Sequence, residues 1–245
     1  MSFCDDSPVL PGHPPKFDRL ARPYRWLEYL SFGPFLQRTR NHFLPQIAHR
    51  RHALVLGDGD GRFTARLLRA NPEIQVHAVD LSAAMLIELQ KSSTSHHHRL
   101  TVEQADLRTW RPSNLEAYDL VVTHFVLDCL TASEISTLAS RLALSITPDA
   151  LWLVSEFAIP QHRYGRAVAR SLVSFLYRVF RFLTGLQIRS LPDYAEVLTS
   201  AGFQLNAGHS RLGGLLVSQL WSYPEGEKCI PIGTAVVSTK RGACS

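Results

Sequence analysis

Short apolar runs alternate with longer helical stretches through the middle of this chain. Five runs are rich in β-branched or long apolar residues, and all fall between residues 53 and 157: ALVLG, IQVHAVD, RLTVEQAD, YDLVVTHF and ALWLVSEF. Strands separated by helices in this way predict a parallel sheet with right-handed crossovers. The nearly continuous apolar character of the runs is typical of strands that are covered on both faces.

The segments before and after this central part predict further helices and a last pair of strands. Residues 1–16 are interrupted by prolines and predict a flexible leader, and residues 17–49 carry the spaced apolar residues of helical segments. After the central part, a long helix is expected over residues 165–184 and a shorter one from Pro192. FQLNAGHS and GLLVSQLWS then lie close enough along the chain to form an antiparallel hairpin, and the tail over 224–245 has no clear assignment.

The expected long helix is strongly amphipathic. Arginines gather on one arc over residues 166–183, and the opposite, wider arc is apolar. Three interpretations fit this pattern: a lid packed on the sheet, a wall of a pocket for an apolar substrate, or a basic helix lying on an anionic membrane surface. The aromatic residues between Tyr24 and Phe35 also favour an apolar pocket, although aromatic side chains are ordinary core residues as well.

The charge and cysteine content narrow the classes of protein to be considered. The chain has 245 residues, 45% of them apolar, and a net charge of +5 from basic residues that are scattered rather than clustered, which argues against a nucleic-acid partner. The four cysteines show no metal-ligand spacing, and a chain of this size needs no disulfides. Because there is no apolar signal core and no membrane-length apolar run, a cytoplasmic protein is expected. The triple histidine at residues 96–98 fits a polar loop better than a metal site, since adjacent imidazoles do not easily converge on one ion.

A glycine-rich turn follows the first apolar run. Gly57, Gly59 and Gly61 precede a helical stretch, and they allow a tight turn and a close approach of a ligand to the backbone. The spacing does not match the dinucleotide fingerprint G-x-G-x-x-G, since Arg62 and Thr64 stand where glycine is needed, and no G-K-[ST] of a Walker A loop follows. Nicotinamide redox chemistry and nucleoside triphosphate hydrolysis are therefore not favoured.

Polar residues also follow the next three runs, at the points where the predicted strands end. Asp80 lies about 20 residues after the glycine turn, where a carboxylate can accept both hydroxyls of a ribose, although it could also cap the next helix. Asp106 precedes the apolar Leu107, which suits an adenine, although an ordinary loop aspartate is an equally simple interpretation. The fourth run ends in a polar and aromatic cluster: Thr123, His124, Phe125 and Asp128. Because ligands of open parallel sheets bind beyond the carboxyl ends of the strands, these positions predict one nucleoside site.

Taken in order, these motifs resemble those of the class I S-adenosylmethionine-dependent methyltransferases over about residues 50–160. FDRLARPYRWLEYLSFG, LPDYAEVLTSAGF and GGLLVSQLW are similar to flanking segments of the group related to ubiquinone and menaquinone methyltransferases, although the catalytic signature of the quinone enzymes is not evident. The resemblance implies an α/β, Rossmann-like fold: a seven-stranded, mostly parallel sheet with an antiparallel last hairpin, helices on both faces and a helical lid. It also implies a methyltransferase domain over 17–223, with N-terminal lid helices at 17–49, a cofactor-binding core at 50–160, a lid helix insertion at 161–190 and a C-terminal helix and hairpin at 191–223.

S-adenosyl-L-methionine is the cofactor that this resemblance implies, and its expected ligands are the residues at matching positions. The methionine part would be surrounded by Gly57, Asp58, Gly59 and Gly61. The ribose and adenine would lie beside Asp80, Leu81, Asp106 and Leu107, and the sulfonium beside Thr123 and His124. Met85 is placed by its spacing, because it follows Asp80 by about one helical turn and could flank the adenine there, although a core position is the more common role of such a methionine. Tyr24 matches a family tyrosine that approaches the cofactor from the lid. One departure concerns the cofactor's amino end: the family usually has an acidic residue two positions before the first glycine, where this chain has Val55, and Asp58 or Asp60 could compensate.

Methyl transfer from a sulfonium mainly requires alignment of nucleophile, methyl group and sulfur in a dry pocket. A thiolate, phenolate or enolate needs little more, whereas a neutral hydroxyl or a carbon acid needs a base. His124 is the first candidate for that base, and Asp128 and Glu156 are the next, although each could have a structural role instead. We therefore expect the catalytic positions to include Tyr24, His124 and Asp128.

The function expected from the sequence is methylation of a small, apolar molecule: a thiol, a phenol or quinone-like compound, or a lipid. An RNA or protein methyltransferase is a second hypothesis, but no appended RNA-binding module, dense basic patch or amide-recognition motif supports it. A third hypothesis is a non-catalytic protein that binds the cofactor or associates with a membrane. Any peripheral membrane contact would use residues 166–183. The sequence does not indicate an oligomeric state.

Overall fold

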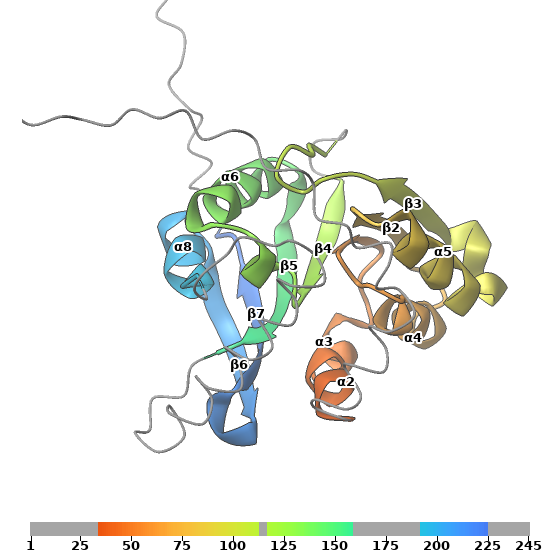
Figure 1. The fold of residues 1–245 in the computed structure, drawn as a ribbon, viewed down its shortest axis with the longest axis horizontal. Coiled ribbons are helices and arrows are strands. Elements are labelled where there is room, and N and C mark those ends of the chain that lie inside the picture. The colour runs from red at the N-terminus through yellow and green to blue at the C-terminus, as the bar shows by residue number, and fades with distance from the viewer. Residues whose placement is uncertain (1–33, 113–116, 159–191, 225–245) are drawn as a thin grey trace, which may run out of the picture.

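The computed structural model describes residues 34–112, 117–158 and 192–224, which form a seven-stranded sheet with helices on both faces (Figure 1). The strand order is β3-β2-β1-β4-β5-β7-β6. The strands are β1 (His52–Leu56), β2 (Gln75–Asp80), β3 (Leu100–Gln104), β4 (Tyr118–His124), β5 (Ile146–Phe157), β6 (Gln204–Arg211) and β7 (Leu216–Ser222). Strands β1 to β5 pair in parallel, while β7 pairs antiparallel with both β5 and β6. The predicted mostly parallel sheet with an antiparallel last hairpin is confirmed.

The helices connect these strands, and side chains satisfy the free amides at some of their starts. The α-helices of the described residues are α2 (Pro34–Arg40), α3 (Leu44–Ile47), α4 (Arg62–Ala70), α5 (Ala83–Ser92), α6 (Ala132–Ala143) and α8 (Tyr194–Ser200). At the start of α5, Ser82 Oγ accepts a hydrogen bond from the Met85 amide at 3.3 Å. At the start of α6, Thr131 and Glu134 form a reciprocal capping box. Such caps supply the acceptors that the first helical turn lacks.

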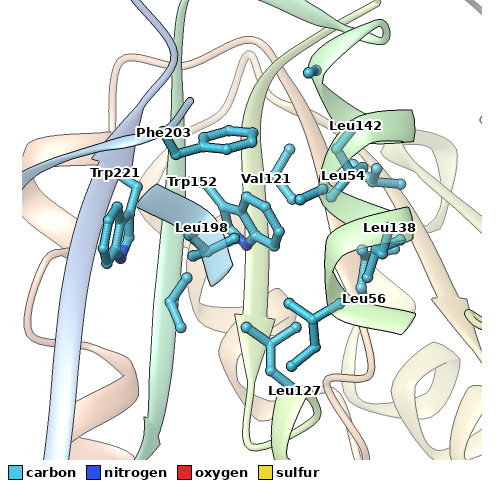
Figure 2. Close-up of a cluster of buried hydrophobic side chains, with 14 of the residues drawn as sticks. Leu54, Leu56, Val121, Leu127, Leu138, Leu142, Trp152, Leu198, Phe203 and Trp221 are labelled. Atoms are coloured by element: carbon cyan, nitrogen blue, oxygen red, sulfur yellow. The ribbon is translucent and has the colours of Figure 1, made fainter. Parts of the chain in front are cut away.

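Two apolar clusters cover the two faces of the sheet. On one face, residues of α6 and α8 pack with Leu54, Val121 and Trp152, as Figure 2 shows, and the rings of Trp152 and Phe203 are 5.1 Å apart. On the other face, residues of α3, α4 and α5 pack with alternate residues of the same strands, including Val122. Because side chains alternate along a strand, consecutive residues at a strand end belong to different faces.

A carboxylate fixes the amino end of β1 against β4. The side chain of Asp119 accepts hydrogen bonds from the backbone amides of Arg51 at 2.7 Å and His52 at 2.8 Å. Further along the same pair of strands, Val55 is in register with Val122. The carboxyl ends of the two central strands are thereby held level with each other.

Several predicted segments lie outside the described residues: the leader, most of the N-terminal lid, the long helix over 166–183 and the tail after residue 224. The shorter helix predicted from Pro192 is α8. The triple histidine lies in a 3-10 helix, η2 (Thr94–Arg99), between α5 and β3. Within the described ranges, every helix is too short or too polar to cross a lipid bilayer.

Candidate active site

The turn between β1 and α4 contains three glycines with a left-handed backbone conformation. Their φ angles are +68° at Gly57, +64° at Gly59 and +75° at Gly61, a region that other residues rarely adopt. A Cβ at Gly57 would lie 2.7 Å from Cγ2 of Val126, and a Cβ at Gly61 would lie 2.5 Å from Cα of Leu89. The turn is therefore packed tightly between the loop after β4 and helix α5, and these two positions require glycine.

Two buried aspartates lie within this turn. Asp58 Oδ2 accepts a hydrogen bond from the Thr64 amide in the first turn of α4 at 2.9 Å, and Asp60 forms an ion pair with Arg62 at 2.9 Å. The other carboxylate oxygen of Asp58 is buried and has no hydrogen-bond partner among the described residues. Burial raises the pKa of Asp58 to about 6, while the Thr64 hydrogen bond and the charge of Arg40 oppose this shift. A donor of a ligand, such as an amino group, can satisfy the remaining oxygen.

Asp80 ends β2, which is the parallel neighbour of β1, and so lies beside the glycine turn. Its Oδ1 accepts a hydrogen bond from the Ser82 amide at 2.8 Å. Ser82 is the N-cap of α5, so the capping role that the sequence left open for Asp80 belongs to Ser82. Asp80 and Leu81 are both half-buried at the edge where the ribose is predicted to bind.

The residues predicted to lie beside the adenine also make contacts within the protein. Asp106 accepts hydrogen bonds from Nε and Nη2 of Arg108, and this pairing lowers the pKa of Asp106. Met85 is 5% exposed and Leu107 is 7% exposed, so both contribute to the core. A contact of these three side chains with adenine stays a prediction, and an adenine amine would share the Asp106 carboxylate with Arg108.

The last residues of β4 point to opposite faces of the sheet. Thr123 is fully buried, and its Oγ1 accepts a hydrogen bond from Nε1 of Trp152 at 3.0 Å. His124 lies on the other face, where its ring makes an edge contact with the Phe63 ring of α4 at 4.5 Å. Phe125, the next residue, has a φ of +55°, which is uncommon for a residue other than glycine. The polar cluster predicted at this strand end is therefore divided between two faces.

His124 is the first candidate for a general base, and its surroundings make it a weak one. Its side chain is buried, and neither ring nitrogen has a hydrogen-bond partner among the described residues. Burial and the positive charge of Arg40 lower the pKa of His124 well below its ordinary value. Because a base is most effective when its pKa lies near the working pH, we expect a neutral imidazole that shapes the site rather than one that removes a proton.

Arg40 is a site residue that the sequence pattern did not single out. It ends α2, its side chain is buried, and its guanidinium carbon lies 5.2 Å from the centre of the Phe125 ring. Its charge acts on both Asp58 and His124, so α2 supplies positive charge to the ends of β1 and β4. In the sequence, nothing distinguishes Arg40 from the other arginines of the same segment. Tyr24, the predicted lid tyrosine, lies outside the described residues.

Glu156 holds the loop that follows β4. This residue is 0% exposed, and its Oε1 accepts hydrogen bonds from the backbone amides of Val126 at 3.0 Å and Leu127 at 2.8 Å. Burial, together with the charge of the neighbouring Asp128, raises the pKa of Glu156 well above its ordinary value. Of the two further candidates for a base, Glu156 thus has a clear structural role. Because the anchored loop packs Val126 against Gly57, Glu156 also supports the glycine turn.

Comparison with known proteins identifies a methyltransferase domain in the centre of the chain. Residues 54–151 match the family described as "Methyltransferase domain". A trans-aconitate 2-methyltransferase from Mycobacterium ulcerans is 28% identical over 186 residues, which cover 73% of this chain and 66% of the relative. A protein of the same name from Methylobacterium radiotolerans is 36% identical over 124 residues, which cover 49% of this chain and 45% of the relative. The chain thus spans about two thirds or less of the length of these relatives.

Solved structures show the same fold. Mitomycin 7-O-methyltransferase has a TM-score of 0.63 at 19% identity, with 84% of this chain and 60% of that chain covered. An O-methyltransferase family protein from Burkholderia thailandensis has a TM-score of 0.64 at 18% identity, with 87% and 65% covered. The glycine turn after β1 and the acidic residues at and after the ends of β2 and β3 agree with this fold. Residues 54–151 thus form a methyltransferase domain, and the relatives and the fold are similar to those of class I S-adenosylmethionine-dependent methyltransferases.

Proposed function

We propose that this chain transfers a methyl group from S-adenosylmethionine to a small-molecule acceptor. The observation that carries the proposal is the left-handed glycine turn, against which Val126 and Leu89 pack. Within this turn, one carboxylate oxygen of Asp58 has no hydrogen-bond partner among the described residues. Asp58 is the acceptor for the cofactor's amino group, and Asp80 is the acceptor for its ribose hydroxyls. When bound, the cofactor supplies a methyl group attached to a positively charged sulfur. This sulfur becomes a neutral thioether when the methyl group is transferred.

The protein's own contribution is to hold the acceptor in line and to exclude water. Positioning of this kind can lower a reaction barrier by about 7–11 kcal/mol. The loop anchored by Glu156 brings Phe125 and Val126 to the ends of β1 and β4, and Arg40 places a positive charge over the Phe125 ring. Since His124 is a weak base in this setting, the site favours an acceptor whose attacking atom is already ionised at neutral pH.

An organic acid fits these properties better than the apolar acceptor that the sequence predicts. The segments that suggested an apolar pocket, around Tyr24 and over 166–183, lie outside the described residues. The curated relatives are named for trans-aconitate, a carboxylate, and a carboxylate oxygen needs no base before it attacks a methyl group. We therefore propose a small carboxylate as the acceptor, ahead of a thiol, phenol, quinone or lipid. The narrower resemblance to quinone methyltransferases stays a prediction.

Binding of S-adenosylhomocysteine, the form of the cofactor that remains after transfer, tests this proposal. Calorimetry on the full chain should show saturable binding, and D80A should weaken it by at least about tenfold. D149N is the matched control, because Asp149 is an exposed carboxylate near the amino end of β5 and should not affect binding. Formation of S-adenosylhomocysteine with panels of organic acids, phenols, quinones, thiols and lipids then identifies the acceptor. A lack of binding at saturating ligand would contradict the proposal.

A further inference from the structure

The end of α2 packs against the β6–β7 hairpin through basic side chains. The imidazole of His42, which follows α2, stacks on that of His209 in β6, with ring centres 3.7 Å apart and planes 15° apart. Arg211 lies two residues further along β6 and therefore faces the same side of the sheet. Burial, His209 and Arg211 all lower the pKa of His42, so the three side chains lie within reach of one another's charge. These three residues are called the basic cluster below.

The basic cluster has hydrogen-bond donors but no acidic partner in the described part of the chain. Nε2 of His209 and Nε of Arg211 are buried, and neither has a hydrogen-bond partner among the described residues. The ion pairs found within those residues all involve other side chains. Buried donors without acceptors destabilise a folded protein, so such an arrangement calls for an acceptor from elsewhere.

The basic cluster lies at the edge of the sheet that carries the candidate active site. Arg211 pairs with Leu216, and Leu216 pairs with Phe157 at the carboxyl end of β5. Helix α2 links the two regions, because Arg40 contacts the loop after β4 while His42, two residues later, contacts β6. In Figure 1, α2 and the turn between β6 and β7 both lie toward the lower edge of the sheet. The basic cluster and the ends of β1 and β4 are therefore joined by the same helix, α2, at the same edge of the sheet.

We propose that His42, His209 and Arg211 bind a carboxylate of the methyl acceptor other than the one that reacts; this assignment rests on the proposed function. A carboxylate has two oxygens, which match the guanidinium and imidazole donors as acceptors. An anion between the basic side chains also offsets their mutual repulsion. The basic cluster thereby selects acceptors that carry a second acidic group away from the attacking atom.

Titration of the full chain with trans-aconitate and with citrate, at saturating S-adenosylhomocysteine, tests the assignment. R211Q should weaken binding of both acids by at least about tenfold, while the affinity for S-adenosylhomocysteine stays within about twofold of the wild type. R211K keeps the positive charge but loses the planar guanidinium group, so its affinity for both acids should lie between those of R211Q and the wild type. R66Q is the matched control, because Arg66 is an exposed arginine on α4, and it should bind both acids as the wild type does.

The outcomes separate this inference from the proposed function. Absence of S-adenosylhomocysteine binding by the wild type contradicts the proposed function. Normal S-adenosylhomocysteine binding, combined with R211Q equal to the wild type, overturns the basic cluster alone. If the wild type binds S-adenosylhomocysteine but neither acid, the basic cluster and the choice of a carboxylate acceptor are both overturned, while cofactor binding stands. An equal loss in R66Q also overturns it, because it indicates general charge attraction. If the thermal melt shows that R211Q does not fold, R211K and H209N provide the same comparison.

Discussion

Replacement of Glu156 tests how the loop after β4 is held in place. The side chain is fully buried, and its Oε1 is the acceptor for the Val126 amide at 3.0 Å and the Leu127 amide at 2.8 Å. E156A removes this acceptor and leaves both amides without it in the interior. E156Q keeps an amide oxygen at nearly the same place, so it is the matched control.

The expected loss of stability follows from these two hydrogen bonds. A buried amide that loses its acceptor costs about 1–3 kcal/mol, and of the two only the Leu127 bond is fully buried. We therefore expect E156A to lower the free energy of unfolding by about 3 kcal/mol, or about 6–12 °C in Tm for a domain of this size. E156Q should lose less than about 1 kcal/mol. Thermal melts of the wild type and both variants measure the difference.

The pH dependence of the same melts gives an independent check. Burial and the charge of Asp128 raise the pKa of Glu156 in the folded protein well above its ordinary value of 4.5. As the pH rises above 4.5, the unfolded chain releases this proton first, so the contribution of Glu156 to stability falls until the pH passes the raised pKa. E156Q does not ionise, and its Tm should rise relative to the wild type over that range. Equal Tm values for E156A and E156Q, or a pH-independent gap between E156Q and the wild type, would refute the reasoning.

Three further substitutions test other parts of the fold and the site. G57A should abolish S-adenosylhomocysteine binding and lower the free energy of unfolding by about 2–4 kcal/mol, because its Cβ would meet Val126 in a left-handed conformation; calorimetry that gave wild-type affinity would contradict this packing. D119A should lower the free energy of unfolding by about 2 kcal/mol, because two backbone amides at the start of β1 lose their acceptor. Its affinity for the cofactor should stay the same, and a weakened affinity would mean that the effect reaches the carboxyl ends of the strands. H124F should keep more than about a tenth of kcat/KM without a change in the pH profile, because the imidazole is buried and its pKa is lowered; a larger loss with a shifted profile would restore His124 as the base.

The sheet was predictable because its signals are local in the sequence. Each buried strand is a nearly continuous apolar run, and ALVLG and YDLVVTHF correspond to the neighbouring strands β1 and β4. The glycine turn and Asp80 mark the ends of β1 and β2 in the order that the fold requires. The last hairpin followed from two strand candidates, FQLNAGHS and GLLVSQLWS, that lie a few residues apart, and it forms β6 and β7.

The surroundings of the site residues were less predictable, because they depend on packing between distant segments. Thr123 and His124 are neighbours in the sequence, but strand alternation sends one to Trp152 and the other to the α4 side. Arg40 reaches the site only through the position of α2 on the sheet. The pairing of Asp106 with Arg108 spans two residues, and a carboxylate followed so closely by an arginine is a signal that sequence reasoning could have used.

The valine at the family's usual acidic position changes which side chain can meet the cofactor's amino group. Val55 is 1% exposed, and it lies between Ala78 and Val122 of the neighbouring strands, so a carboxylate there would be buried against apolar groups. Asp58 lies in the turn itself, where the Thr64 amide binds one of its oxygens and the other has no partner among the described residues. We therefore expect Asp58, rather than a residue at position 55, to meet the cofactor's amino group. An acceptor in the turn is held by the backbone that the glycines already shape, so a valine at position 55 is compatible with the proposed cofactor binding.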